Sequence, residues 1–152
     1  MSDKLKIGDS APLFEAETYG GEKVSLTDVI AGGGVALCFY PRDNTPGCTR
    51  EACSLRDTES RIAKKGITVL GISTDSVKSH EGFRDRQKLN YTLISDKDRK
   101  IINAYGVVSP SNSARRVSFL VDREGKVRHI WKKVDTHAHG DEILNKIEEL
   151  SL

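Results

Sequence analysis

The chain has 152 residues, of which 24 are Lys or Arg and 22 are Asp or Glu, so its formal net charge is +2. This length fits one domain, spanning residues 1–152, that buries about two thirds of the surface of its unfolded chain. The small net charge gives no indication of nucleic-acid binding. No stretch approaches the roughly 18 apolar residues of a membrane-spanning helix, so neither nucleic acid nor a membrane is an expected partner.

The N-terminal segment and the cysteines indicate the cellular compartment of the protein. Residues 1–6 contain no apolar signal region, so we expect an intracellular, cytoplasmic protein. An organelle is the alternative if a targeting segment has been removed. The three cysteines, Cys38, Cys48 and Cys53, are an odd number in an intracellular chain and do not indicate a disulfide scaffold.

The predicted elements begin with a buried strand. A glycine loop at 32–34 precedes residues 35–40, an apolar run that suits a strand covered on both faces. A helix is predicted at 46–65, with Thr45 as its N-cap and Pro46 at its first position. Residues 67–73 follow as a second buried strand.

The second half of the chain continues the alternation. The next elements are a helix from Asp75 or Ser76 to about residue 89, a strand at 91–95, a helix at 96–105, a hairpin of 117–122 with 126–131, and a closing amphipathic helix at 140–150. Strands that alternate with helices and end in an antiparallel pair predict a mixed sheet between helices. A thioredoxin-like α/β fold fits this order.

The segment 41–53, Pro-Arg-Asp-Asn-Thr-Pro-Gly-Cys-Thr-Arg-Glu-Ala-Cys, carries the strongest functional signal. It places Cys48 where the first strand gives way to a helix, and Cys53 follows five residues later. The N-terminus of a helix presents unpaired N–H groups and the positive end of a dipole. A thiol there tends to ionise, and the thiolate is the reactive form. The sequence therefore predicts a redox-active or nucleophilic cysteine.

These residues also carry a family likeness. Pro41, Thr45 and Cys48, in the pattern Pro-x-x-x-Thr-x-x-Cys, resemble the active-site motif of the peroxiredoxins. The full run 40–53 resembles the Q-type branch, also called the bacterioferritin-comigratory proteins, and the similarity covers nearly the whole chain. The resemblance implies a thioredoxin-like fold and a thiol peroxidase that reduces hydrogen peroxide and organic hydroperoxides without a metal or cofactor.

The resemblance implies separate roles for two cysteines. Cys48 would be the peroxidatic cysteine, and Cys53 would resolve its sulfenic acid as an intramolecular disulfide. Five residues apart on one helix, their Cα atoms would be roughly 8.7 Å apart, whereas a disulfide needs less than about 7 Å. We therefore expect the first turns of the helix to unwind. A thioredoxin-like or glutaredoxin-like protein would then reduce the disulfide, and the family branch suggests a monomer or a weak homodimer.

Four further residues receive roles from the same resemblance. Thr45 would hydrogen-bond both the peroxide and the thiolate. Arg116 would hold positive charge beside both of them, and Glu51 would help to position Arg116. Pro41 would shield the pocket.

Two other functions use the same cysteine pair. A disulfide oxidoreductase of the thioredoxin type is disfavoured, because four residues rather than two separate Cys48 from Cys53. A thiol-based redox sensor or chaperone is the alternative to an enzyme. It would be oxidised once without rapid cycling, so turnover with a reductant distinguishes it from a peroxidase.

The remaining cysteine and the histidines support simpler interpretations. Cys38 lies in an apolar strand, where a free cysteine behaves as a small hydrophobic residue. His137 and His139 could join the two reactive cysteines at a zinc ion, but the chain has no second cysteine pair, so a zinc site is not expected. His80 and His129 are expected to be structural or on the surface.

Overall fold

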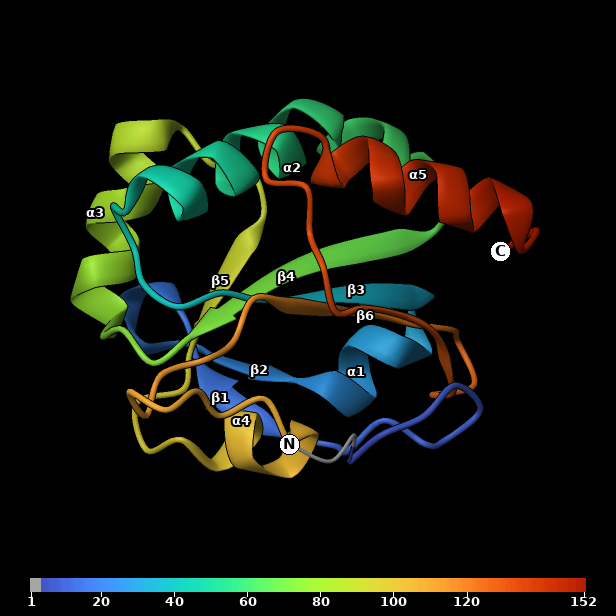
Figure 1. Ribbon diagram of the computed structural model, residues 1–152, viewed down its shortest axis with the longest axis horizontal. Helices are drawn as coiled ribbons and strands as arrows, with labels where there is room; N and C mark the ends of the chain where they lie inside the picture. The colour runs from blue at the N-terminus through green and yellow to red at the C-terminus, as the bar shows by residue number, and fades with distance from the viewer. Residues whose placement is uncertain (1–3) are drawn as a thin grey trace.

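A mixed sheet of seven strands forms the centre of the fold in this computed structural model, which describes residues 4–152 (Figure 1). The strands are β1 (Glu15–Glu17), β2 (Lys23–Ser25), β3 (Gly34–Phe39), β4 (Ile67–Ser73), β5 (Thr92–Ser95), β6 (Val117–Val121) and β7 (Val127–Trp131). The helices are α1 (Leu26–Ala31), α2 (Pro46–Lys64), α3 (Val77–Gln87), α4 (Lys100–Tyr105) and α5 (His139–Glu149), with a 3-10 turn η1 (Tyr19–Gly21).

The sheet order is β2-β1-β5-β4-β3-β6-β7. β3, β4 and β5 are parallel, and the outer strands pair in antiparallel fashion. This arrangement confirms the expected α/β class, a mixed sheet flanked by helices. Part of the N-terminal segment considered above, residues 1–3, lies outside the described residues.

Helices cover both faces of the sheet, and β3 shows how the sequence specifies this. Every residue of β3 is buried, and its side chains alternate between two hydrophobic clusters. Ala36 and Cys38 pack with residues of α2, α3 and α5, whereas Val35 and Leu37 pack with residues of α1 and α4. Figure 1 shows the three longer helices on one side of the sheet and the two short ones on the other. A strand covered on both faces explains the continuous apolar run.

Most of the predicted boundaries lie within two residues of the observed ones. α2 begins at Pro46 as expected, and Gly66, with φ at +79°, follows its end. α3 begins after Ser76, whose hydroxyl accepts a hydrogen bond from the Ser79 N–H at 3.1 Å. Ser76, rather than Asp75, is therefore the N-cap of α3.

The helix predicted at 96–105 is wrong in its first four residues, because α4 begins only at Lys100. The Asp96 carboxylate accepts from the N–H groups of Ile101 at 3.0 Å and Ile102 at 2.8 Å, so it caps the helix from a position before it. Arg99 has φ at +64°, which interrupts the helical backbone between them. The pattern also fails to predict β1, β2 and α1, since elements of three to six residues are too short to show a clear period.

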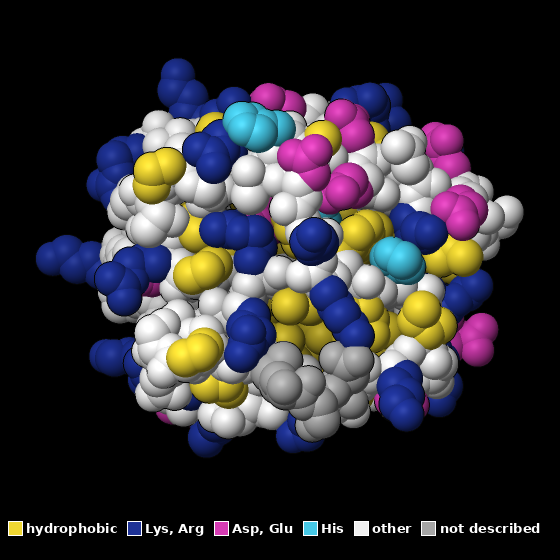
Figure 2. Space-filling view, in the orientation of Figure 1, with side chains coloured by type: hydrophobic (Ala, Val, Ile, Leu, Met, Phe, Trp, Pro, Cys, Tyr) yellow, Lys and Arg dark blue, Asp and Glu magenta, His cyan; other side chains and the backbone are white. Residues whose placement is uncertain are grey.

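The surface carries charges of both signs. On the face shown in Figure 2, Lys and Arg side chains are spread among apolar and acidic ones rather than gathered into one patch. This distribution agrees with the small net charge of the chain. Within residues 4–152, no helix has the length and apolar character needed to cross a bilayer.

Candidate active site

The loop between β3 and α2 carries the first half of the motif. Thr45 is the N-cap residue of α2, with extended backbone at φ −82° and ψ 154°, and Pro46 occupies the first helical position. A proline suits this position, because its fixed φ is helical and its missing N–H would have no partner there. The Thr45 hydroxyl donates to the Arg42 carbonyl oxygen at 3.2 Å and makes no capping bond. The N-cap position is thus confirmed, without side-chain capping. Pro41 lies half-buried at the start of the same loop.

Arg116 connects Cys48 to Glu51. Its Nη1 donates to Glu51 Oε1 at 2.7 Å, and its Nη2 donates to Cys48 Sγ at 3.3 Å. The sheet explains why these residues meet: Phe39 at the end of β3 pairs with Val117 at the start of β6. The residue before Val117 therefore lies beside the loop that follows β3. The structure brings together three of the residues that the resemblance assigns to one site.

Cys48 is the third residue of α2, in the turn whose N–H groups have no partners within the helix. Its sulfur thus lies at the positive end of the helix dipole and next to a cation, and both favour a thiolate. Gly47 leaves space for Arg116, because a Cβ at this position would lie 3.1 Å from Arg116 Nη2, which would have to shift by a few tenths of an ångström. A larger residue would crowd the guanidinium that contacts Cys48.

Glu51 is a buried carboxylate that is only 2% exposed. Burial is the largest influence on it and raises its pKa, although His139 and Arg116 act in the opposite direction. Its Oε1 accepts from Arg116, whereas its Oε2 has no hydrogen-bond partner among residues 4–152. Arg116 is therefore held by a carboxylate whose charged form is disfavoured by burial, and protonation of Glu51 would loosen that hold.

A second group of polar side chains lies behind Glu51. Cys38 Sγ, a carboxylate oxygen of Glu51 and a ring nitrogen of His139 lie within 4.8 Å of one another. These are atom types that bind zinc, but both ring nitrogens of His139 already have partners, Glu142 Oε1 at 2.9 Å and Ser118 Oγ at 2.8 Å. Burial raises the pKa of Cys38, which suits the inert thiol expected in β3. Sequence reasoning missed the position of His139, because it depends on how α5 packs.

Cys53 lies on the same unbroken helix as Cys48, and both are free thiols. Cys53 is partly exposed, and its Sγ donates weakly to Gln87 Oε1 at 3.6 Å. The two cysteines are therefore placed as expected for a reduced state in which the helix is intact. The structure does not bring their sulfurs together into a disulfide.

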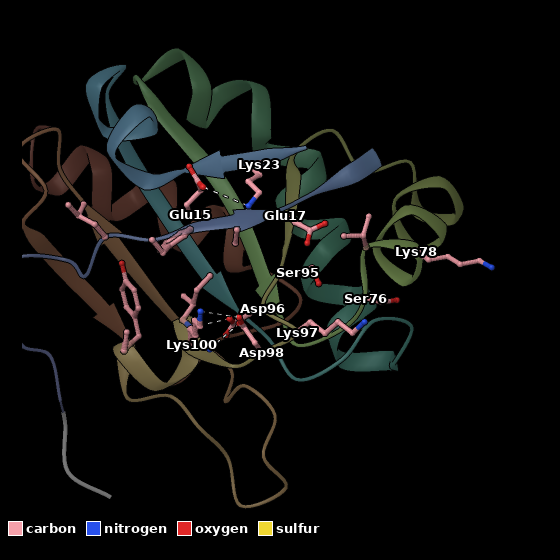
Figure 3. Close-up of a pocket in the computed structure, with 17 residues that line it drawn as sticks. Glu15, Glu17, Lys23, Ser76, Lys78, Ser95, Asp96, Lys97, Asp98 and Lys100 are labelled. Carbon is pink, nitrogen blue, oxygen red and sulfur yellow. Dashed lines mark hydrogen bonds and ion pairs between the residues drawn. The ribbon is translucent and has the colours of Figure 1, made fainter. Parts of the chain in front are cut away.

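The structure has a small cavity beside Cys48 and a larger groove away from it. A cavity of about 10 Å³, lined by Cys48 and Cys38 among others, has room for about one water molecule, so it is not where an organic hydroperoxide binds. A larger groove of about 990 Å³ is bordered by β1, the start of α3 and α4, with Glu15, Asp96 and Lys100 in its lining (Figure 3). The lining of this groove includes none of the motif residues.

Comparisons with known proteins agree with this geometry. The AhpC/TSA family model matches residues 7–130. A putative peroxiredoxin bcp of Coxiella burnetii is 42% identical over 150 residues, which cover 94% of this chain and 99% of the relative. Peroxiredoxin Bcp of Escherichia coli K12 is 40% identical over 152 residues, which cover 95% and 97%.

Solved structures show the same fold. Peroxidoxin BcpB from Mycobacterium tuberculosis matches with a TM-score of 0.89 at 30% identity and covers 96% of this chain and 98% of its own. A bacterioferritin comigratory protein of Xanthomonas campestris, studied for alkyl peroxide reduction, matches with a TM-score of 0.86 at 30% identity and covers 95% and 100%. These neighbours confirm the thioredoxin-like fold. The chain belongs to the AhpC/TSA family and, within it, to the Bcp or Q-type peroxiredoxins, which are thiol peroxidases.

Proposed function

We propose that this peroxidase reduces hydrogen peroxide and organic hydroperoxides, with Cys48 as the attacking thiolate and Cys53 as the resolving thiol. The observation that carries the proposal is the 3.3 Å contact between Arg116 Nη2 and Cys48 Sγ in the first turn of α2. A cation and a helix N-terminus at one sulfur favour the thiolate that the chemistry requires. Arg116 also offers a fixed donor to a bound peroxide.

In the first step the Cys48 thiolate attacks one peroxide oxygen and the O–O bond breaks. The sulfur is oxidised by two electrons to a sulfenic acid, and the second oxygen leaves as water or an alcohol after it takes up a proton. Charge spreads over both oxygens in the transition state, where Arg116 and the Cys48 backbone N–H act as preorganised donors. The Thr45 hydroxyl, which now donates to Arg42, turns to hydrogen-bond the peroxide, and Pro41 shields the pocket.

In the second step Cys53 attacks the Cys48 sulfur, so an S–S bond forms, the S–O bond breaks and water leaves. Both cysteines lie on α2, so the first turns of the helix have to unwind before the bond can close. A dithiol protein of the thioredoxin or glutaredoxin type then reduces the disulfide by exchange. The cytoplasmic location and the monomeric or weakly dimeric state stay predictions from the sequence.

Intact mass and peptide mapping after one equivalent of hydrogen peroxide test the proposal. We expect a loss of two hydrogens and a Cys48–Cys53 linkage, and a Cys48→Ser variant should show neither. One added oxygen at Cys48 without a linkage would move resolution to an external thiol. Oxidation of Cys48 no faster than that of a free thiol would contradict the proposed role of Cys48.

A further inference from the structure

The active-site loop is tied to the rest of the fold through a buried carboxylate, Asp43. Its side chain is 1% exposed. Its Oδ1 accepts from the Tyr40 hydroxyl at 2.6 Å, and its Oδ2 accepts from the Ser79 hydroxyl at 2.8 Å. The same Oδ2 lies 2.8 Å from Nδ1 of His80, a side chain that is fully buried. Both carboxylate oxygens are thus held, one by the residue that follows β3 and the other by α3.

His80 is hydrogen-bonded through both of its ring nitrogens. Its Nε2 lies 3.0 Å from the carbonyl oxygen of Ile94, which can only accept, so Nε2 carries a hydrogen. Hydroxyl groups donate to both oxygens of Asp43, so the carboxyl group accepts a hydrogen bond on each side. His80 Nδ1 and Asp43 Oδ2 share one further hydrogen bond, so His80 and Asp43 form a fully buried hydrogen-bonded pair. Removal of one partner is costly, because it leaves the other buried polar group without its hydrogen bond.

The backbone of Asp43 is fixed as well as its side chain. Its N–H donates to Asp75 Oδ2 at 2.8 Å, and the same oxygen accepts from the Ser73 hydroxyl at 2.7 Å. Asp75 and Ser73 belong to the end of β4 and the turn that follows it. Four hydrogen bonds, three to the side chain and one from the backbone, therefore hold the loop two residues after Pro41 and two before Thr45.

The residues directly after Asp43 are held differently. Asn44 has φ at +67°, so the chain turns sharply there. The Asn44 side chain accepts from Arg86 Nε at 3.1 Å and Nη2 at 2.8 Å, a contact between two exposed residues. The Cys53 sulfur makes a long contact of 3.6 Å to Gln87 Oε1. The exposed Asn44 contact competes with water and the Cys53 contact is long, so each adds little to stability. Asp43 is thus held by buried hydrogen bonds, whereas the hydrogen bonds from Asn44 and Cys53 to α3 are weak.

We propose that Asp43 and His80 are positioning residues of the peroxidase: their buried pair holds Thr45 and Cys48 in the reactive arrangement, and it stays in place as the fixed end when α2 unwinds. The inference rests on the proposed roles of Cys48 and Cys53. In this proposal, the residues before and after the turn at Asn44 serve different steps of the reaction. The buried pair keeps the peroxide step fast, and the exposed contact of Asn44 and the part-buried contact of Cys53 break during resolution.

A metal site is the competing interpretation of this cluster. One ligand atom each from Asp43, Asp75 and His80 lies within 4.8 Å of the others. The hydrogen bonds described above already use both oxygens of Asp43 and both nitrogens of His80. We therefore favour positioning. A peroxide rate that falls after treatment with EDTA and returns with zinc would overturn this assignment.

Two rates measured by rapid acid quench and mass spectrometry test the role of the pair. One is the second-order rate constant for Cys48 oxidation, and the other is the first-order rate of disulfide formation. Asp43→Ala should lower the first about 10²-fold, the usual consequence of misplaced reacting groups, without slowing the second. Asp43→Asn should recover most of the loss, because an amide can accept from Tyr40 and donate to a neutral His80.

A destabilised control separates positioning from general damage to the fold. Ile102→Ala removes a buried side chain on the opposite face of the sheet and leaves the Asp43 network intact. We expect it to lower stability while both rates stay at the wild-type values. Equal slowing of Cys48 oxidation in Ile102→Ala and Asp43→Ala would overturn the inference, and so would a wild-type rate in Asp43→Ala. A slow reaction of Cys48 in the unaltered protein would instead contradict the proposed function.

Hydrogen exchange tests the fixed end without any substitution. In the disulfide form, the Thr49 amide, which now bonds to the Thr45 carbonyl oxygen, should lose its protection. The Asp43 amide, which bonds to Asp75, should keep it. Loss of protection at both amides would show that the loop unfolds as a whole, and would overturn the inference.

Discussion

Arg116 and Cys48 are 68 residues apart in the chain, yet the guanidinium Nη2 of Arg116 lies 3.3 Å from the Cys48 sulfur. The other end of the same guanidinium bonds to Glu51 Oε1 at 2.7 Å. The planar fork of arginine can hold both partners at once, which a lysine ammonium on its flexible chain cannot do in the same geometry. The arrangement therefore depends on the shape of the side chain as well as on its charge.

Arg116→Lys should lower the second-order rate constant of Cys48 with hydrogen peroxide about 10²-fold, the usual effect of removing one preorganised donor. The matched control is Arg115→Lys, since Arg115 donates to the Val108 carbonyl oxygen at 3.1 Å and its neighbour provides the contact to sulfur. We expect the control to react at the wild-type rate. Similar losses in both variants would show a general effect of Arg-to-Lys replacement in this segment rather than loss of the contact to sulfur, and a wild-type rate in Arg116→Lys would show that any basic side chain suffices.

The buried carboxylate of Glu51 predicts a pH dependence of stability. Burial raises its pKa in the folded state above the ordinary value of about 4.3. Between these two values the folded protein binds more protons than the unfolded chain, so stability falls as pH rises through this window. Glu51→Gln removes this contribution. We would measure urea unfolding at several pH values from 4 to neutral. The free energy of unfolding should fall less with rising pH in the variant than in the wild type.

The same substitution should reduce activity, because a neutral amide holds Arg116 less firmly than a carboxylate does. We expect slower oxidation of Cys48 in Glu51→Gln at neutral pH. The wild-type rate should fall as Glu51 becomes protonated on the acid side, and the variant should lack that part of the profile. If the rate fell in the same way at acid pH in both proteins, the fall would come from the titration of another group.

Cys53→Ser separates attack from resolution. Cys48 should react with the first peroxide at the wild-type rate, since Cys53 contacts Gln87 and lies outside the Arg116 contact. Without the resolving thiol, a second peroxide should give sulfinic acid, detected as two added oxygens on the Cys48 peptide. Cys38→Ala is the control and should still form the Cys48–Cys53 disulfide. A disulfide between Cys38 and Cys48 in the Cys53→Ser protein would contradict the inert role of Cys38.

Gly140→Ala should destabilise the protein, because α5 packs closely on α2 at this residue. A Cβ there would collide with Thr58 Oγ1 and lie 2.7 Å from the Ser54 carbonyl oxygen. We expect a loss of about 1–3 kcal/mol in the free energy of unfolding, measured in urea. Gly82→Ala is the control: the atoms that its Cβ would meet belong to the flexible end of Arg86, so helix propensity should leave it neutral or more stable. Equal losses would remove the packing explanation.

The sequence predicted the elements with strong local signals. The apolar runs of β3 and β4 are long enough to identify as buried strands, and Pro46 and Gly66 mark the two ends of α2. It could not predict β1 and β2, which have three residues each, or the late start of α4. In that last case the Asp96 side chain competes with the helical pattern, because it binds the N–H groups of the first turn from outside.

By itself, the sequence determined that Cys48 stands at the start of a helix with Cys53 five residues later, since these features depend only on neighbours along the chain. Only the tertiary structure decided that Arg116 contacts Cys48, because the pairing of β3 with β6 brings them together. It also decided that His80, expected to be structural or on the surface, is buried against Asp43. Such contacts join distant segments, and the burial that makes them strong exists only after those segments have packed.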